Sequence, residues 1–141
     1  MTTTGQRRSA ALRPHTIGLW VLFLCDAGLL VASGLIHLHL WDIAYRHVKT
    51  LDVLFLVQVV ACLLLAVVLL VTRHLLAVAA AWLLMAGTIV GFILARTVGI
   101  FGFKLTFSTG LANTVLIVEA AALIMLAVTG MVLMRSSGSR A

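Results

Sequence analysis

The apolar stretch at residues 17–42 constrains this chain most, because titratable side chains interrupt it. The stretch is long enough to cross a bilayer, since about 20 apolar residues rising about 1.5 Å each span roughly 30 Å of hydrocarbon. Asp26 lies near its middle, and His37 and His39 lie near its end. A carboxylate exposed to lipid at that depth would cost at least about 2 kcal/mol. The helix therefore needs protein or a water-filled cavity beside Asp26.

The polar residues of this stretch share one face of the helix. Successive residues turn by about 100°, so positions that follow one another at spacings of four, three and four fall on one stripe. The stripe consists of Asp26, Leu30, Ser33 and His37. We expect it to face other helices.

The composition indicates a membrane protein rather than a soluble domain. Of the 141 residues, 63% are hydrophobic and 10% are charged, and the mean hydropathy is +1.22. So few polar residues could not cover a soluble surface. The net charge of +6 lies in short segments between apolar runs, so we expect lipid headgroups rather than nucleic acid as partner. Cys25 and Cys62 lie within apolar runs, which indicates neither a disulfide framework nor a metal site.

Four apolar segments predict an all-α, integral membrane four-helix bundle. They cover about residues 17–41, 53–72, 75–95 and 111–134. Residues 1–16 are predicted to form a polar N-terminal segment, and residues 135–141 a C-terminal tail. Residues 96–110 are rich in glycine and aromatic residues, which predicts a short interfacial or re-entrant element over one end of the bundle. A cleaved signal peptide is disfavoured, because Asp26 and the continuing apolar run do not fit one.

The basic residues predict that both termini face the cytoplasm, with the bundle in the cell membrane. Six fall on the side of the termini and four on the other side: Arg7, Arg8, Arg13, Arg73, Arg135 and Arg140 against Arg46, Lys49, Arg96 and Lys104. Cytoplasmic segments carry the excess of Lys and Arg.

Polar residues of different helices are expected at similar depths. Counted from the connector side at about 1.5 Å per residue, His37, Gln58 and Glu119 lie roughly 6, 8 and 12 Å deep. Arg96 lies at the mouth of the third helix, whereas Asp26 lies in the opposite half. Two interpretations follow. Glu119 pairs with Arg96 or His37 to fix helix packing, or the polar groups form a working site.

Metal binding is the weaker interpretation of the histidines. On a continuous helix His37 and His39 point about 200° apart and cannot converge on one ion. They could do so only if the helix ends by Leu38, and His47 could then join them to bind copper, zinc or iron. Otherwise we expect these histidines to be solvated or to anchor the chain at the interface.

Haem or a quinone would be the cofactor if a redox site exists, although none is predicted outright. A b-type haem needs facing histidines, and the second, third and fourth helices lack an interior one, so a second copy or another subunit would have to supply it. A quinone head needs less: His37, Tyr45 and Glu119 beneath the aromatic residues Phe101 and Phe103.

The pattern GLIHLHLW, followed by Tyr45-Arg46 and LFLVQ, resembles a group of uncharacterised small four-helix membrane proteins of actinobacteria. The glycine-aromatic residues 99–103 and Glu119 also fit this group, and the resemblance runs from Ile17 onward. It implies a four-helix bundle, and it carries no catalytic residues over.

The favoured function is a non-enzymatic accessory or interaction subunit. It would pack in a homo-oligomer or a larger respiratory or transport complex, with Gly87 and Gly91 of a GxxxG pattern making close helix contacts. The first alternative is a redox or lipid-ligand site in the outer leaflet, built on His37, Tyr45, Gln58, Arg96 and Glu119. The second alternative is a proton- or ion-conducting oligomer lined by Asp26, Ser33 and His37. Motifs of hydrolases and phosphate loops are absent, so an enzyme is not favoured.

Overall fold

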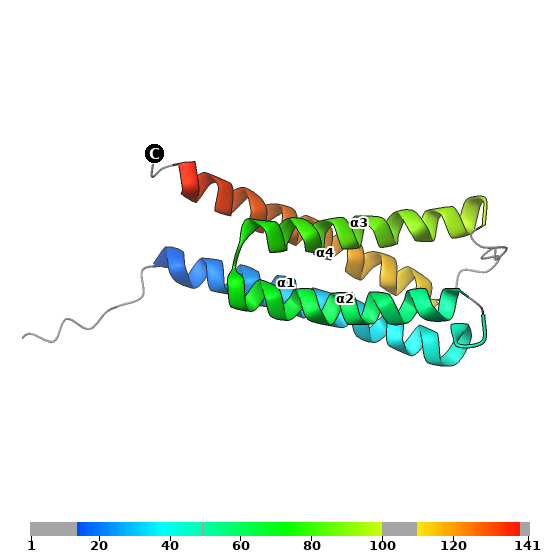
Figure 1. The fold of residues 1–141 in the computed structure, drawn as a ribbon. Coiled ribbons are helices and arrows are strands. Elements are labelled where there is room, and N and C mark those ends of the chain that lie inside the picture. Colours follow the sequence, from blue (N-terminus) through cyan, green and yellow to red (C-terminus); the bar gives the residue numbers. More distant parts are fainter. Residues whose placement is uncertain (1–13, 49, 100–109, 139–141) are drawn as a thin grey trace, which may run out of the picture.

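The computed structural model describes residues 14–48, 50–99 and 110–138. Within these ranges the chain is a four-helix bundle without strands (Figure 1). The helices are α1 (Pro14–Leu40), α2 (Leu51–Thr72), α3 (Leu75–Thr97) and α4 (Gly110–Gly138). The predicted all-α four-helix fold is confirmed.

All four helices are long and apolar enough to cross a membrane. The 22 residues of α2 extend roughly 33 Å at about 1.5 Å per residue, slightly more than the thickness of the hydrocarbon core. Large apolar side chains also cover the outside of the bundle, and Leu64, Leu76 and Ile117 are each exposed by 60% or more. Acyl chains are a suitable solvent for such a surface. The chain therefore has the helices of a multi-pass membrane protein.

The first helix continues past its predicted end at residue 41. A π-helical turn covers Trp41–Tyr45, and the Arg46 N–H donates to the Trp41 carbonyl oxygen at 2.9 Å. This bond spans five residues instead of four and so widens the turn. Tyr45, expected in a connector, is thereby placed against α2, with its ring centroid 4.6 Å from that of Phe55.

A two-residue turn joins α2 to α3 and makes them antiparallel, as predicted. Arg73 adopts a left-handed conformation (φ 48°), and its N–H donates to the Leu69 carbonyl oxygen at 3.0 Å. This arrangement ends α2. His74 caps α3, because its Nδ1 accepts from the Leu76 N–H at 3.3 Å. The Arg73 guanidinium also lies 4.3 Å from the ring centroid of Trp20 on α1.

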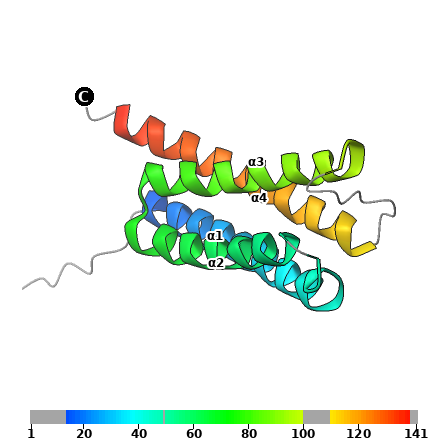
Figure 2. The same cartoon turned by 45° about the vertical axis from the view of Figure 1, so that its right-hand side comes forward.

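The helices alternate in direction, so the start of α1 and the end of α4 lie at the same end of the bundle (Figure 1). We call this the terminal end. The opposite end, with the π-helical turn, is the connector end. α1 packs along α2 and α4, and α3 packs along α4, whereas α2 and α3 make the sparsest contact between adjacent helices. From their shared turn, α2 and α3 diverge towards the connector end (Figures 1 and 2).

Glycine allows close helix contact at a position different from the predicted one. A Cβ added to Gly34 of α1 would lie 3.2 Å from the Cβ of Cys62 on α2. In contrast, a Cβ added to Gly87 or Gly91 would meet no atom within 4 Å. These two glycines therefore make no close helix contact within the described chain, because α2 has diverged from α3 there. Their contact with a second chain stays a prediction.

Other predicted segments lie partly outside the described residues. The predicted re-entrant element falls mostly on residues 100–109, and Phe101, Phe103 and Lys104 belong to that range. Arg96, which was expected at its start, belongs to α3. The predicted N-terminal segment falls mostly on residues 1–13, and the helical backbone of α4 continues to Gly138.

Candidate ligand-binding site

The stripe predicted on the first helix lies inside the bundle. Asp26, Leu30 and Ser33 are fully buried, and His37 is 5% exposed. α2 and α4 cover this side of α1. Protein therefore shields the carboxyl and imidazole groups from lipid, as the cost of their exposure requires.

Asp26 meets α4 in the half of the bundle nearer the terminal end. Thr129 Oγ1 donates to Asp26 Oδ2 at 2.6 Å, and both residues are fully buried. The bond links the first helix to the last and satisfies one carboxyl oxygen. The apolar Leu30 lies on the stripe between Asp26 and Ser33, which separates this pair from the polar groups nearer the connector end.

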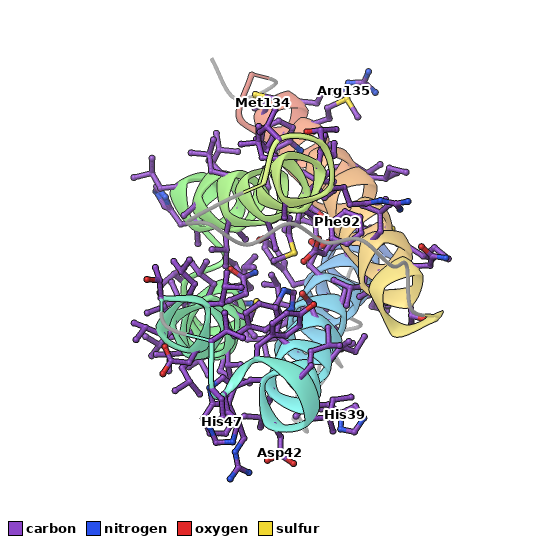
Figure 3. The ribbon with its side chains drawn as sticks, turned by 90° about the vertical axis from the view of Figure 1, so that its right-hand side faces the viewer. His39, Asp42, His47, Phe92, Met134 and Arg135 are labelled. Atoms are coloured by element: carbon purple, nitrogen blue, oxygen red, sulfur yellow. The ribbon has the colours of Figure 1, made fainter. Side chains whose placement is uncertain are left out.

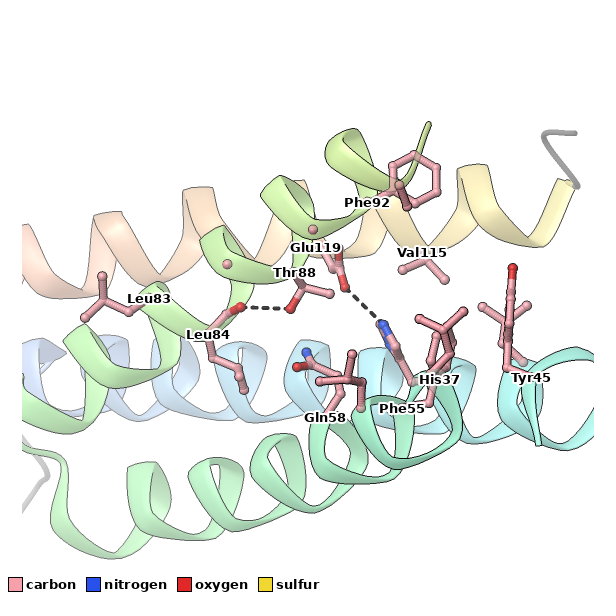
Figure 4. Close-up of a pocket in the computed structure, with 16 residues that line it drawn as sticks. His37, Tyr45, Phe55, Gln58, Leu83, Leu84, Thr88, Phe92, Val115 and Glu119 are labelled. Carbon is pink, nitrogen blue, oxygen red and sulfur yellow. Dashed lines mark hydrogen bonds and ion pairs between the residues drawn. The ribbon is translucent and has the colours of Figure 1, made fainter. Parts of the chain in front are cut away.

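His37 is held by its own helix. Its Nδ1 lies 2.9 Å from the carbonyl oxygen of Ser33, one turn earlier. A carbonyl oxygen can only accept, so Nδ1 carries the hydrogen and donates. The other ring nitrogen, Nε2, points across the bundle to Glu119 of α4 (Figure 4).

Glu119 is the least satisfied polar side chain of the site. It is fully buried, and neither carboxyl oxygen has a hydrogen-bond partner among the described residues. His37 Nε2 lies 3.6 Å from Glu119 Oε1, which is too long for a hydrogen bond. Of the two predicted partners of Glu119, His37 faces it and Arg96 does not.

A cavity of about 390 Å³ lies beside His37 and Glu119 (Figure 4). Its volume falls within the range of small-molecule sites. All four helices line it, with mostly apolar side chains and the polar residues His37, Tyr45, Gln58, Thr88 and Glu119. Such a mixture, apolar walls with a few converging polar groups, is typical of ligand sites.

Aromatic rings from different helices contribute to the lining of the cavity. The Phe55 ring lies between two neighbours, with its centroid 5.3 Å from that of His37 and 4.6 Å from that of Tyr45. Phe92 of α3 also lines the cavity. These faces suit contact with a flat ring.

The cavity opens towards lipid between α2 and α3. Two of its lining residues are exposed at the surface: Leu54 of α2 at 44% and Leu83 of α3 at 65%. His37 and Glu119 lie on the buried side. The sparse contact between α2 and α3 leaves this opening. A ligand could therefore enter sideways from the bilayer, with its polar head leading.

Comparison of the chain with protein families, curated proteins and solved structures finds no match. The geometry of the site is therefore the basis for a function. The resemblance to actinobacterial membrane proteins stays a prediction.

The structure brings together four of the six polar residues predicted for a site: His37, Tyr45, Gln58 and Glu119. Arg96 is exposed, and its guanidinium lies 5.9 Å from the Phe92 ring centroid. Asp26 belongs to the separate pair with Thr129. The titratable groups at the cavity include the His37 imidazole and the Glu119 carboxyl, and no described arginine lines it.

Sequence reasoning missed Thr88, Phe55 and Phe92 as lining residues. Thr88 and Phe92 directly follow Gly87 and Gly91, which also line the cavity. The GxxxG pattern, which predicts a close helix contact, thus also marks residues that line the cavity. Phe55 carries no such signal, because a phenylalanine within an apolar helix is ordinary.

The histidines do not converge on a metal site. His39 and His47 are exposed and lie at the outside of the connector end, near Asp42 (Figure 3), whereas His37 is buried. Among the described residues, no group of three or more His, Cys, Asp or Glu side chains could hold an ion.

Proposed function

We propose that this membrane protein binds a lipid-soluble molecule. The polar head of the ligand lies at His37 and Glu119, and its apolar part extends between α2 and α3 into the bilayer. This function corresponds to the lipid-ligand alternative predicted from sequence, with the site reduced to His37, Tyr45, Gln58 and Glu119.

One observation carries the proposal: a fully buried carboxyl group faces a cavity with both oxygens unpartnered. A buried acceptor without a partner costs about 1–3 kcal/mol. Asp26, by comparison, has Thr129 as a partner for Oδ2, so only its Oδ1 lacks one among the described residues. A ligand that donates to Glu119 would offset that cost, and the apolar walls would hold the rest of the molecule.

Filling the cavity tests the proposal. Gly87 lines the cavity, and a Cβ added there meets no atom within 4 Å, so the side chain of Gly87→Leu has open space to enter. We expect the variant to fold and to lose the bound molecule. The measurement is extraction of the protein purified from native membranes in mild detergent, followed by mass spectrometry of the extract.

Gly18→Leu is the matched control. Gly18 also has open space around it and lies outside the cavity, so this variant should retain the molecule. If both variants and the original protein yield the same extract, or none yields a lipid-soluble molecule in stoichiometric amount, the proposal is wrong.

The second candidate is the accessory subunit. The space beside Gly87 and Gly91, which favours a ligand, would also admit a helix of a partner or of a second copy. Gly87→Leu would then release a protein from the purified complex rather than a small molecule. Analytical ultracentrifugation of the same samples separates the two candidates.

A further inference from the structure

The hydrogen-bond donors at the cavity are mostly used within the protein. His37 Nδ1 donates to the Ser33 carbonyl oxygen at 2.9 Å, and Thr88 Oγ1 donates to the Leu84 carbonyl oxygen at 2.8 Å. The Gln58 amide donates one hydrogen to Cys62 Sγ at 3.6 Å.

The acceptors at the buried side of the cavity are left over. Both oxygens of Glu119 are unpartnered, and His37 Nε2 is an acceptor in the neutral ring because Nδ1 carries the hydrogen. These are three acceptor atoms. A single proton held by Glu119 or His37 converts only one of them into a donor, so at least two acceptors remain on the two residues at the buried side of the cavity.

We infer, on the basis of the proposed function, that the ligand head is an aromatic ring bearing hydroxyl groups, of the hydroquinone class, and that the site prefers it to the corresponding quinone. Each hydroxyl group of such a ring can donate one hydrogen bond, either to Glu119 or to His37 Nε2. A quinone carbonyl only accepts, so it would leave the same acceptors unpartnered. This preference concerns binding alone and involves no electron transfer.

The walls of the cavity favour a ring over an aliphatic ammonium group. Phe55 and Tyr45 stack with centroids 4.6 Å apart and present aromatic surface to the cavity, as does Phe92. A flat neutral ring gains this contact without the cost of moving a charge out of water. The tail can follow the opening marked by Leu54 and Leu83 into the bilayer.

The test is a titration of the purified full-length protein in detergent under anaerobic conditions, with binding measured by native mass spectrometry. The probes are 2-methyl-3-decyl-1,4-naphthohydroquinone, kept reduced by dithionite, the matching naphthoquinone, and dodecylammonium. We expect the hydroquinone to bind about tenfold more tightly than the quinone, since one donor matched to a buried acceptor makes about that difference.

Glu119→Gln tests which residue sets the preference. The amide keeps the size of the side chain but replaces one acceptor oxygen with a donor, so we expect the ratio of the two affinities to fall by about tenfold. Asp26→Asn is the control, because it makes the same chemical change outside the cavity and should leave the ratio unchanged.

The remaining outcomes overturn the inference. Equal or tighter binding of the quinone, or tighter binding of dodecylammonium, refutes the hydroquinone preference but keeps a ligand site. If no probe binds, the inference is wrong as well, and the extraction of Gly87→Leu against Gly18→Leu then decides separately whether the cavity holds any ligand.

Discussion

Two buried carboxyl groups in this bundle differ in what surrounds them. Asp26 Oδ2 accepts a hydrogen bond from Thr129 at 2.6 Å, and Asp26 does not line the cavity beside His37. Glu119 has no hydrogen bond among the described residues and faces a cavity. In an apolar interior the first arrangement stabilises the fold, whereas the second leaves an acceptor for a ligand. This difference is the reason for proposing a structural role for Asp26 and ligand binding for Glu119.

Removing the partner of Asp26 should destabilise the bundle. Thr129→Val keeps the shape of the side chain but leaves a buried carboxyl without its donor, so we expect a loss of about 1 kcal/mol in the free energy of unfolding. Reversible unfolding in mixed detergent micelles measures it. Thr72→Val is the control, because the Thr72 hydroxyl donates only to the Val68 carbonyl oxygen of its own exposed helix end. Equal losses in the two variants would contradict the structural role of the pair.

At the scale of the helices, α2 and α3 make the one sparse contact among the four adjacent pairs of described helices in the bundle. α1 and α2 approach closely at Gly34, whereas α2 and α3 leave their short turn and diverge. The turn at Arg73 makes these two helices neighbours but does not determine the distance between them along their length. The cavity results from this divergence.

Adding a side chain at the close contact should separate α1 from α2. Gly34→Leu places a Cβ 3.2 Å from the Cβ of Cys62, which lies at the start of the side chain and cannot rotate away. We expect a destabilisation of about 1–3 kcal/mol, typical of overpacking. Gly28→Leu on the same helix serves as the control, because a Cβ added to Gly28 meets no atom within 4 Å. Thermal unfolding followed by circular dichroism compares the two, and similar melting temperatures would refute the close contact.

At the scale of the molecule, the exposed acidic and basic side chains are distributed unequally between the connector end and the terminal end. Of the four acidic residues, Asp42 and Asp52 lie near the connector end, and Asp26 and Glu119 are buried. The surface of the terminal end therefore carries no acidic side chain. Arg73 and Arg135 lie at the terminal end, with four further arginines in the sequence segments beyond the described helices. The excess of basic residues, rather than the placement of the acidic ones, supports the proposal that the terminal end faces the cytoplasm.

Reporter fusions test that orientation. Alkaline phosphatase fused after Ala141 should be inactive, because the enzyme requires export, and fused after Val48 it should be active. Green fluorescent protein at the same positions should give the opposite pattern. The reverse result at both positions would invert the proposed topology and place the cavity in the cytoplasmic half of the membrane.

The sequence by itself determined the helices and the buried side of the first one. Hydropathy and length are local properties, and the turn of about 100° per residue placed Asp26, Ser33 and His37 on one stripe. Residue counts along the helices also brought His37, Gln58 and Glu119 to similar depths, and all three line the cavity.

Only the tertiary structure decided how these groups meet. Depth follows from counting residues, but the rotation of each helix about its axis and the spacing between helices depend on packing between distant segments. Those contacts turned Glu119 towards His37 rather than Arg96, and they left Gly87 and Gly91 facing open space rather than a helix. The cavity exists because α2 and α3 diverge, and no local pattern in either helix encodes that divergence.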